Sequence, residues 1–281
     1  MWPFSRSHTQ TTQRSPLFFT NTLSGKKELF TSLKSGIATI YSCGPTVYNK
    51  AHIGNLRSYV FADTIARVLS SSGYHVKRAI NITDVGHLVS DGDDGEDKME
   101  VGAKNEGLTA EDVANKYTKM FIEDIQLLNL DTEDILFPRA THYIKEQIAL
   151  VEALEKKGLT YKTKDGIYFD TAEYPGYGKL GGIPKECIQE GSADSLESRI
   201  NLSAHATHVR IKINYEKHAP ADFALWKFSP MGAVRQQEWS SPWGRGFPGW
   251  HIECSAMVKS LLGSEIDIHT GAIDLIPIHH N

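Results

Sequence analysis

The stretch IATIYSCGPTVYNKAHIGNLRSYVFADTIARVLSSSGYHVKRAI, residues 37–80, decides the fold class of this chain. Residues 37–41 are rich in β-branched and aromatic side chains, which predicts a strand, and Cys43-Gly44-Pro45 predicts the turn that ends it. Apolar side chains then recur at close to helical spacing over residues 53–69. Residues 76–80 predict a second strand. Strand, helix and strand in this order predict a parallel pair joined by a right-handed crossover.

Outside this unit, the pattern continues to alternate between strands and helices. Helices are predicted over 110–128 and 143–157 and after Pro248, a hairpin over 159–162 and 166–170, and strands over 223–226 and 265–269. We therefore predict an α/β fold whose sheet is split by an inserted connective module. The predicted parts are a tail (1–16), the first half of the sheet domain (17–140), the insertion (141–221) and the second half (222–281).

The tail, residues 1–16, is rich in Ser and Thr, with two arginines and no acidic residue. It lacks the apolar core of a secretory signal. A disordered tail or a start-site artefact is favoured over an organelle transit peptide.

The composition excludes several classes of protein. The chain has 281 residues, of which 40% are hydrophobic and 23% charged, and its formal net charge is −4. This length suits roughly two domains, and the composition argues against global disorder. The sequence holds no apolar run near the ~18 residues that a membrane span needs. The charge gives no support for a broadly basic nucleic-acid-binding surface. Three cysteines are too few for a disulfide scaffold, which favours a reducing cytosol.

Candidate ligand-binding residues open the helix that follows the first strand. In parallel sheets, ligands bind at the carboxyl ends of strands, and a helix N-terminus there suits a phosphate group. His52 and Asn55 lie three residues apart in this first turn, and both can donate hydrogen bonds to an anion. Gly54 allows a ligand to approach the backbone closely. Taken alone, this tetrapeptide is weak evidence for a ligand site, and a helix-capping histidine with a tolerated glycine is the favoured interpretation.

Cysteine and histidine residues form a second set of candidates. His251, His269, His279 and His280 gather near the carboxyl end, Cys254 lies among them, and Cys43 ends the first predicted strand. Sulfur and nitrogen ligands of this kind suit Zn²⁺. The distance along the chain from Cys43 to Cys254 fits no local zinc-finger pattern, so the spacing alone favours buried apolar cysteines.

Two other segments carry less information. The acidic run over residues 91–97 lacks the spacing of a calcium loop, and a solvated loop is favoured. Trp239, Trp243 and Trp250 crowd a loop rich in Gly and Pro. Packing of this loop is the default interpretation, and the wall of a substrate pocket is the alternative.

Taken together, these segments resemble cysteinyl-tRNA synthetases, a class I aminoacyl-tRNA synthetase family, over Leu17 to Asn281. The matching blocks are Asn21-Thr22-Leu23, Lys27 to Phe30, Cys43 to Tyr48, the HIGH motif at His52-Ile53-Gly54-Asn55, Asn81 to Asp84, Asp222 to Lys227, Ser241 to Ser255, Asp267 to Leu275 and His279-His280. The resemblance implies a Rossmann-like nucleotide-binding sheet. It also reverses the cautious interpretation of Cys43, Cys254 and His52.

The resemblance implies a role for each group of residues. Cys43, Cys254 and His279 would hold one Zn²⁺ that binds the thiolate of the substrate cysteine, which serine cannot imitate. The fourth zinc ligand of the family, a Glu, would fall at position 283. The substrate amino acid would contact Thr46, Thr83, Trp250 and His269. ATP, with Mg²⁺, would contact Pro45, His52, Gly54, Asn55, Gly271 and Asp274, and His52 and Asn55 would be catalytic.

The sequence departs from the family in a few places. Asn55 replaces the last His of the HIGH motif, and Ala272 and Ile273 stand where many relatives have Gly and Ser. No Lys-Met-Ser-Lys-Ser motif and no helical anticodon-binding region follow. We therefore expect an amino-terminal portion of a longer enzyme, one that alone fails to charge tRNA.

The function expected from the resemblance is that of a cysteine–tRNA ligase in protein biosynthesis. It would activate L-cysteine with ATP to cysteinyl adenylate and pass cysteine to tRNA(Cys). A cytoplasmic monomer with no membrane partner is expected. The alternatives are a mycothiol-type cysteine ligase with an amino-sugar acceptor and a truncated, non-catalytic paralogue that binds zinc or nucleotide.

Overall fold

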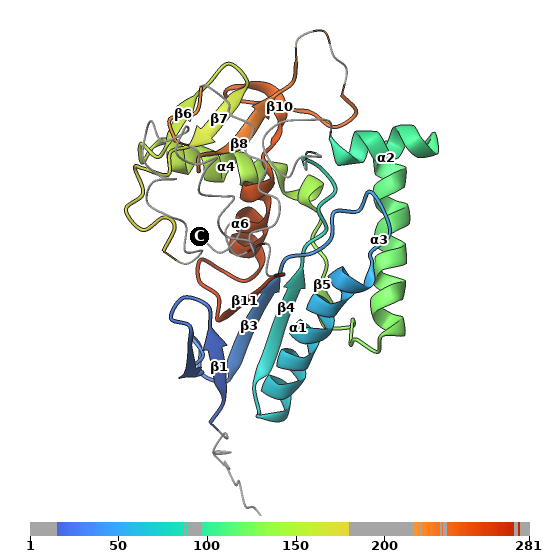
Figure 1. Cartoon of the computed structure of the whole chain (residues 1–281), viewed down its shortest axis with the longest axis vertical. Coiled ribbons are helices and arrows are strands. Elements are labelled where there is room, and N and C mark those ends of the chain that lie inside the picture. Colours follow the sequence, from blue (N-terminus) through green and yellow to red (C-terminus); the bar gives the residue numbers. More distant parts are fainter. Residues whose placement is uncertain are drawn as a thin grey trace, which may run out of the picture.

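The computed structural model of the chain describes residues 16–86, 88, 97–179, 216–219, 221–230, 232, 235–272 and 275. Within these residues, the strands form a four-stranded sheet, a five-stranded sheet and a two-stranded hairpin. Figure 1 shows the five-stranded sheet above the four-stranded one, with helix α6 (Trp250–Leu261) running between them.

The four-stranded sheet confirms the α/β fold class. It has the order β11-β3-β4-β5, and every neighbouring pair is parallel. Its members are β3 (Ile37–Ser42), β4 (His75–Ile80), β5 (Ile135–Leu136) and β11 (Ile268–Thr270). The predicted strand–helix–strand unit is present: α1 (Ile53–Ser71) connects β3 to β4, which pair from Ile37↔His75 to Ser42↔Ile80. Gly73, at φ +85°, takes the left-handed conformation just beyond the helix end.

One face of α1 packs on this sheet. Ile65, Ala66 and Leu69 are buried against Ala38 and Ile40 of β3. The hairpin of β1 (Phe18–Asn21) and β2 (Lys26–Leu29) precedes the sheet, and rings from this segment pack on the same cluster. The helical spacing seen in the sequence therefore reports a real buried face.

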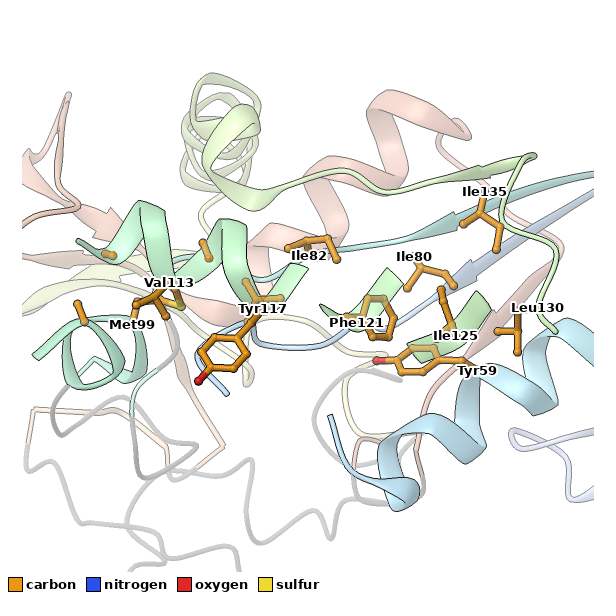
Figure 2. Close-up of a cluster of buried hydrophobic side chains, with 14 residues drawn as sticks. Tyr59, Ile80, Ile82, Met99, Val113, Tyr117, Phe121, Ile125, Leu130 and Ile135 are labelled. Carbon is orange, nitrogen blue, oxygen red and sulfur yellow. The ribbon is translucent and has the colours of Figure 1, made fainter. Parts of the chain in front are cut away.

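Among the described residues, the largest buried cluster joins α1, β4 and the two helices that lie between β4 and β5 in the chain. These helices are α2 (Lys98–Glu106), which the sequence pattern did not predict, and α3 (Ala110–Leu127). Figure 2 shows the side chains of this cluster from all four elements. Tyr59 of α1 meets Phe121 of α3 with ring centroids 4.9 Å apart. This cluster fixes α3 along α1, on the side of the sheet seen at the right of Figure 1.

The five-stranded sheet is antiparallel and has the order β6-β7-β8-β10-β9. Its strands are β6 (Thr160–Lys162), β7 (Gly166–Phe169), β8 (Phe223–Phe228), β9 (Trp239–Ser241) and β10 (Gly244–Pro248). The predicted hairpin is confirmed as β6–β7. The segment rich in Gly, Pro and Trp, expected to be a loop, forms the β9–β10 hairpin instead. Its turn is formed by Pro242 and Trp243, and β10 begins at Gly244, whose φ of +136° suits only glycine.

Two helical segments connect this sheet to the parallel one. The short 3₁₀ helix η1 (Ala140–Tyr143) leads into α4 (Ile144–Glu155), which packs with Ile252 of α6 against β7 and β8. Strands β8 to β10 belong to residues 222–281 but pair, through β8, with β7 of residues 141–221. Among the described residues, none of the helices combines the length and apolarity that a membrane span requires.

Candidate functional site

The carboxyl ends of β3, β4 and β11 meet at one edge of the parallel sheet. The Cys43 N–H donates to the carbonyl of Thr270, which ends β11. The Val47 N–H donates to the Thr83 carbonyl, and the Thr83 N–H donates to the Pro45 carbonyl. These bonds hold the loop after β3 against the loop after β4. They bring together Pro45, Thr46 and Thr83, three of the residues assigned to ligands from sequence.

A buried amide, that of Asn81, lies between these two loops. Its Oδ1 accepts from the Gly44 N–H at 2.7 Å, and its Nδ2 donates to Thr83 Oγ1 at 3.0 Å. Asn81 and Thr83 are each 1% exposed. A Cβ at Gly44 would lie 1.5 Å from the Asn81 carbonyl oxygen, so only glycine fits there. Sequence reasoning missed the role of Asn81, although a polar residue directly after a strand was a usable signal.

The residues of the HIGH motif begin α1. His52 is the N-cap residue, and its Nδ1 accepts from the Gly54 N–H at 3.1 Å. Asn55 Oδ1 accepts in turn from the His52 N–H at 3.2 Å, which completes a capping box. Both side chains are exposed. The capping interpretation of His52 is thus correct, and it has a chemical consequence.

That consequence concerns the hydrogen of the imidazole. Because Nδ1 of His52 accepts a hydrogen bond, the neutral ring carries its N–H on Nε2. Because Oδ1 of Asn55 accepts, its amide nitrogen is left to donate. The first turn of α1 therefore combines two side-chain donors with the positive end of a helix, an arrangement that suits a phosphate.

The thiols of Cys43 and Cys254 lie together in a buried cluster at the end of β3, packed with Tyr41 and Ala79. A hydrogen bond with the Cys254 thiol, and then burial, raise the pKa of the Cys43 thiol well above its ordinary value. His269 of β11 approaches from the same side, with Nε2 at 3.3 Å from Cys43 Sγ. The chain thus brings together two cysteines that are 211 positions apart and a histidine that had been assigned to the substrate.

This cluster fits zinc by the chemistry of its donors. The two buried sulfurs are soft ligands of the kind that zinc prefers. Burial and mutual contact disfavour the thiolates, so metal binding there would release protons. His279, the third predicted ligand, lies outside the described residues. Within those residues, no group of three or more His, Cys, Asp and Glu side chains is placed to hold a metal ion.

Helix α6 contributes the next part of the site. Trp250 begins the helix and lies one turn before Cys254, so both side chains project from one face. Trp250 is partly buried, and its ring contacts that of His251 with centroids 6.0 Å apart. Gly271 directly follows β11, at the same edge of the parallel sheet. Asp274, predicted to contact adenosine, falls outside the described residues.

Glu253 is a feature of this region that sequence reasoning missed. Its side chain is completely buried, and the side chain that approaches its carboxyl group is that of Thr83. Burial, followed by the nearby Cys254 and Asp84, raises the pKa of Glu253 well above the ordinary value. Nothing in the local sequence signals this, because a Glu inside an amphipathic helix is ordinarily exposed.

The weaker candidates have structural explanations. Of the acidic run, only Asp97 is described; it caps α2 by accepting from the Met99 N–H and pairs with Arg235. The Trp243 indole N–H lies 3.1 and 3.2 Å from the two carboxylate oxygens of Glu155 in α4. Trp243 and Trp239 also pack on the cluster of the antiparallel sheet. These contacts support the packing interpretation of the tryptophan-rich segment.

Comparison with known proteins adds independent information. The family model described as the class I (C) tRNA synthetase catalytic domain matches residues 29–281. Cysteine–tRNA ligase 1 of Burkholderia lata is 47% identical over 266 residues, which cover 95% of this chain and 53% of the relative. The cysteine–tRNA ligase of Zymomonas mobilis is 46% identical over 265 residues, covering 94% and 48%. That of Treponema denticola is 44% identical over 264 residues, covering 92% and 49%. The chain spans about half the length of these curated relatives.

Proposed function

Because this chain belongs to the family of class I (C) tRNA synthetase catalytic domains, we propose that it activates L-cysteine with ATP as the catalytic part of a cysteine–tRNA ligase. The observation that carries the proposal is the pair of buried thiols, Cys43 and Cys254, beside the strand-end loops. An amino-acid site built around two cysteine sulfurs suits a substrate that is itself a thiol. The helix terminus of α1, with its two donors, supplies a place for a triphosphate.

Zinc would be held by Cys43, Cys254 and His279. When bound, the metal supplies a soft Lewis acid for the thiolate of the substrate. Serine offers only a hard hydroxyl oxygen at that position, so this chemistry favours cysteine by the strength of the metal–sulfur bond. Thr46, Thr83, Trp250 and His269 surround the rest of the amino acid in this proposal. The closeness of His269 to Cys43 supports its placement beside the substrate sulfur.

In the activation step, a carboxylate oxygen of cysteine attacks the α-phosphorus of ATP. A phosphorus–oxygen bond forms to the amino acid, and the bond to pyrophosphate breaks. His52 Nε2–H and the Asn55 amide donate to phosphate oxygens and stabilise the charge that builds up, with Mg²⁺ on the triphosphate. Gly54, Pro45 and Gly271 let the nucleotide approach the backbone, and Asp274 takes the adenosine side. The chain thereby contributes mainly orientation and charge stabilisation.

The acceptor in this proposal is the 3′ end of tRNA(Cys), and the place of action is the cytoplasm, where the enzyme works as a monomer. An amino-sugar acceptor and a non-catalytic role are not favoured, because the named relatives are cysteine–tRNA ligases.

The test is ATP–pyrophosphate exchange by the purified, zinc-supplied chain. Exchange that depends on L-cysteine and is absent with L-serine supports the proposal. Exchange that is equal with both amino acids contradicts the thiol-based selection. If the chain neither exchanges pyrophosphate nor binds cysteine or ATP in calorimetry, the proposal is wrong for this polypeptide. A chelator that abolishes cysteine binding while ATP still binds would link the metal to the amino-acid side of the site.

A further inference from the structure

We propose that Asn81 is a positioning residue of the amino-acid site, where its buried amide sets the direction in which the Thr83 hydroxyl donates. This inference rests on the proposed function, in which Thr83 contacts the substrate. It adds a residue to which none of the sequence patterns assigned a role.

The direction of the amide is fixed by its first partner. The Gly44 backbone N–H can only donate, so the Asn81 atom at 2.7 Å from it must be the oxygen. The other end of the amide is therefore the NH₂ group, and it faces Thr83 Oγ1 at 3.0 Å. Reversing the amide would place two donors against each other. The assignment thus follows from backbone chemistry and not from a choice between similar atoms.

The direction of the Thr83 hydroxyl follows from the direction of the amide. Because Oγ1 accepts from Asn81, its own hydrogen must point away from Asn81, and on that side a hydrogen bond joins the Thr83 hydroxyl to the buried Glu253 carboxyl. Burial of both residues, each 1% exposed, prevents water from supplying an alternative donor. The hydroxyl is therefore held in one orientation before any ligand arrives. A side chain that is already fixed costs less to order on ligand binding than one that can rotate.

Only the side chain of Thr83 needs this support. Its backbone N–H and carbonyl already bond to the loop after β3, at Pro45 and Val47. Loss of the bond from Asn81 Nδ2 should leave the position of Thr83 unchanged and free its hydroxyl to turn. The bond to Gly44 is a separate contact on the opposite end of the amide. The two contacts can therefore be tested apart.

Asn81→Asp separates them. The introduced carboxylate keeps an acceptor for the Gly44 N–H but has no donor for Thr83 Oγ1. The Thr83 hydroxyl should then reverse and donate to position 81. The measurement is the Kd of the zinc-supplied chain for 5′-O-(N-(L-cysteinyl)sulfamoyl)adenosine, a stable analogue of cysteinyl adenylate, by calorimetry. We expect Asn81→Asp to weaken binding about 10-fold or more.

A double-mutant cycle identifies the route of the effect. In a Thr83→Val background there is no hydroxyl to orient, so Asn81→Asp should change the Kd by less than about 3-fold. A 10-fold loss in both backgrounds would overturn the proposal, because Asn81 would then act through the fold or through Gly44. No loss in the wild-type background would overturn it as well.

Gln147 provides a matched control for burial. It is also a completely buried amide, whose Nε2 donates to the Ala140 carbonyl at 2.8 Å, in helix α4. Gln147→Glu makes the same change of amide to carboxylate and should lower stability without changing the Kd. If the wild-type chain fails to bind the analogue at all, the proposed function fails. If it binds and the cycle is additive, only the role of Asn81 fails.

Discussion

At the scale of single residues, the site combines groups whose chemistry could be predicted with groups whose partners could not. Cys43, His52 and Thr83 stand in recognisable blocks, and the structure brings their segments to one edge of the sheet. Asn81 and Glu253 were missed because hydrogen bonding and burial depend on the folded arrangement. For His52, the structure adds that capping and donation are compatible, since they use different ring nitrogens.

The two cysteines should be required for metal binding. Cys43→Ser and Cys254→Ser each remove a sulfur ligand, so the bound zinc should fall from about one ion per chain to near zero. The measurement is metal content by atomic absorption after dialysis against a weak chelator. Cys187→Ser, at the one cysteine of the sequence not assigned to the metal, is the control and should keep the metal. Retention of zinc by both single variants would contradict the assignment.

His52 should matter for the activation rate and not for cysteine binding. His52→Ala removes a donor to the developing charge and should slow pyrophosphate exchange about 10²–10³-fold. It also removes a helix cap, which costs about 1 kcal/mol of stability. His52→Asn restores a good cap without the imidazole, so it should recover stability but not rate. His75→Ala, at the opposite end of the sheet strands, is the control. A collapse of cysteine affinity with an unchanged rate would show that the role is wrong.

At the scale of elements, periodicity predicted the long helices and the central strands because their buried faces repeat regularly. The pattern did not predict α2, a nine-residue helix with Gly102 in its middle and little apolar spacing. The β1–β2 hairpin was missed because its residues are mostly exposed. The β9–β10 hairpin was taken for a loop because glycines interrupt it. The pairing of β8 with β7 spans residues 170–222, and no local pattern indicates such a partner.

The pairing of β7 with β8 is supported by an ion pair whose pH dependence can be measured. Lys227 Nζ lies 2.5 Å from Asp165 Oδ2. Burial acts to raise the pKa of Asp165, but hydrogen bonds from Lys227 and Thr163 outweigh it and hold the pKa below its ordinary value. The ion pair therefore contributes stability above the ordinary aspartate range. That contribution is lost as the pH falls through the lowered pKa.

Asp165→Asn should accordingly destabilise the chain at pH 7 and have less effect at pH ~3.5, where the unfolded aspartate is largely protonated. Because the carboxylate is partly exposed, the variant should lose at most about 1 kcal/mol of unfolding free energy at pH 7. Urea unfolding at the two pH values measures it. If Asp165→Asn lowers the free energy of unfolding by the same amount at both pH values, packing and not the ion pair accounts for the effect.

At the scale of the whole molecule, α6 contacts both sheets. Ile252 packs in the cluster of the antiparallel sheet, whereas Cys254 packs against β3 and β4 of the parallel one. Figure 1 shows the helix between the two sheets. The α/β class and the interruption of the parallel sheet could be predicted from sequence. The sharing of one helix could not, because both contacts depend on tertiary packing.

Shared packing should make the two sheets unfold together. Ile252→Ala should lower the free energy of unfolding by about 2–5 kcal/mol, whereas Leu127→Ala, at an 85% exposed side chain, should change little. Tryptophan fluorescence reports mainly the antiparallel sheet, where three of the five tryptophans lie, and thiol reactivity in a Cys187→Ser background reports Cys43 and Cys254. The midpoints in urea should coincide for the two probes and shift together in Ile252→Ala. Separate midpoints would show that the sheets unfold independently.

The position of α6 also limits how this molecule can be recombined with others. The antiparallel sheet, β6 to β10 (residues 160–248), resembles an exchangeable cassette because its five strands follow one another in the chain, between β5 and α6. However, its last strand, β10, is followed directly by α6, the helix that carries Trp250 and Cys254. A chimera that exchanges the cassette at its visible borders would re-aim that helix and separate the two sulfurs. Exchange between relatives should succeed only where the cassette and the helix are inherited as one piece, through Leu261.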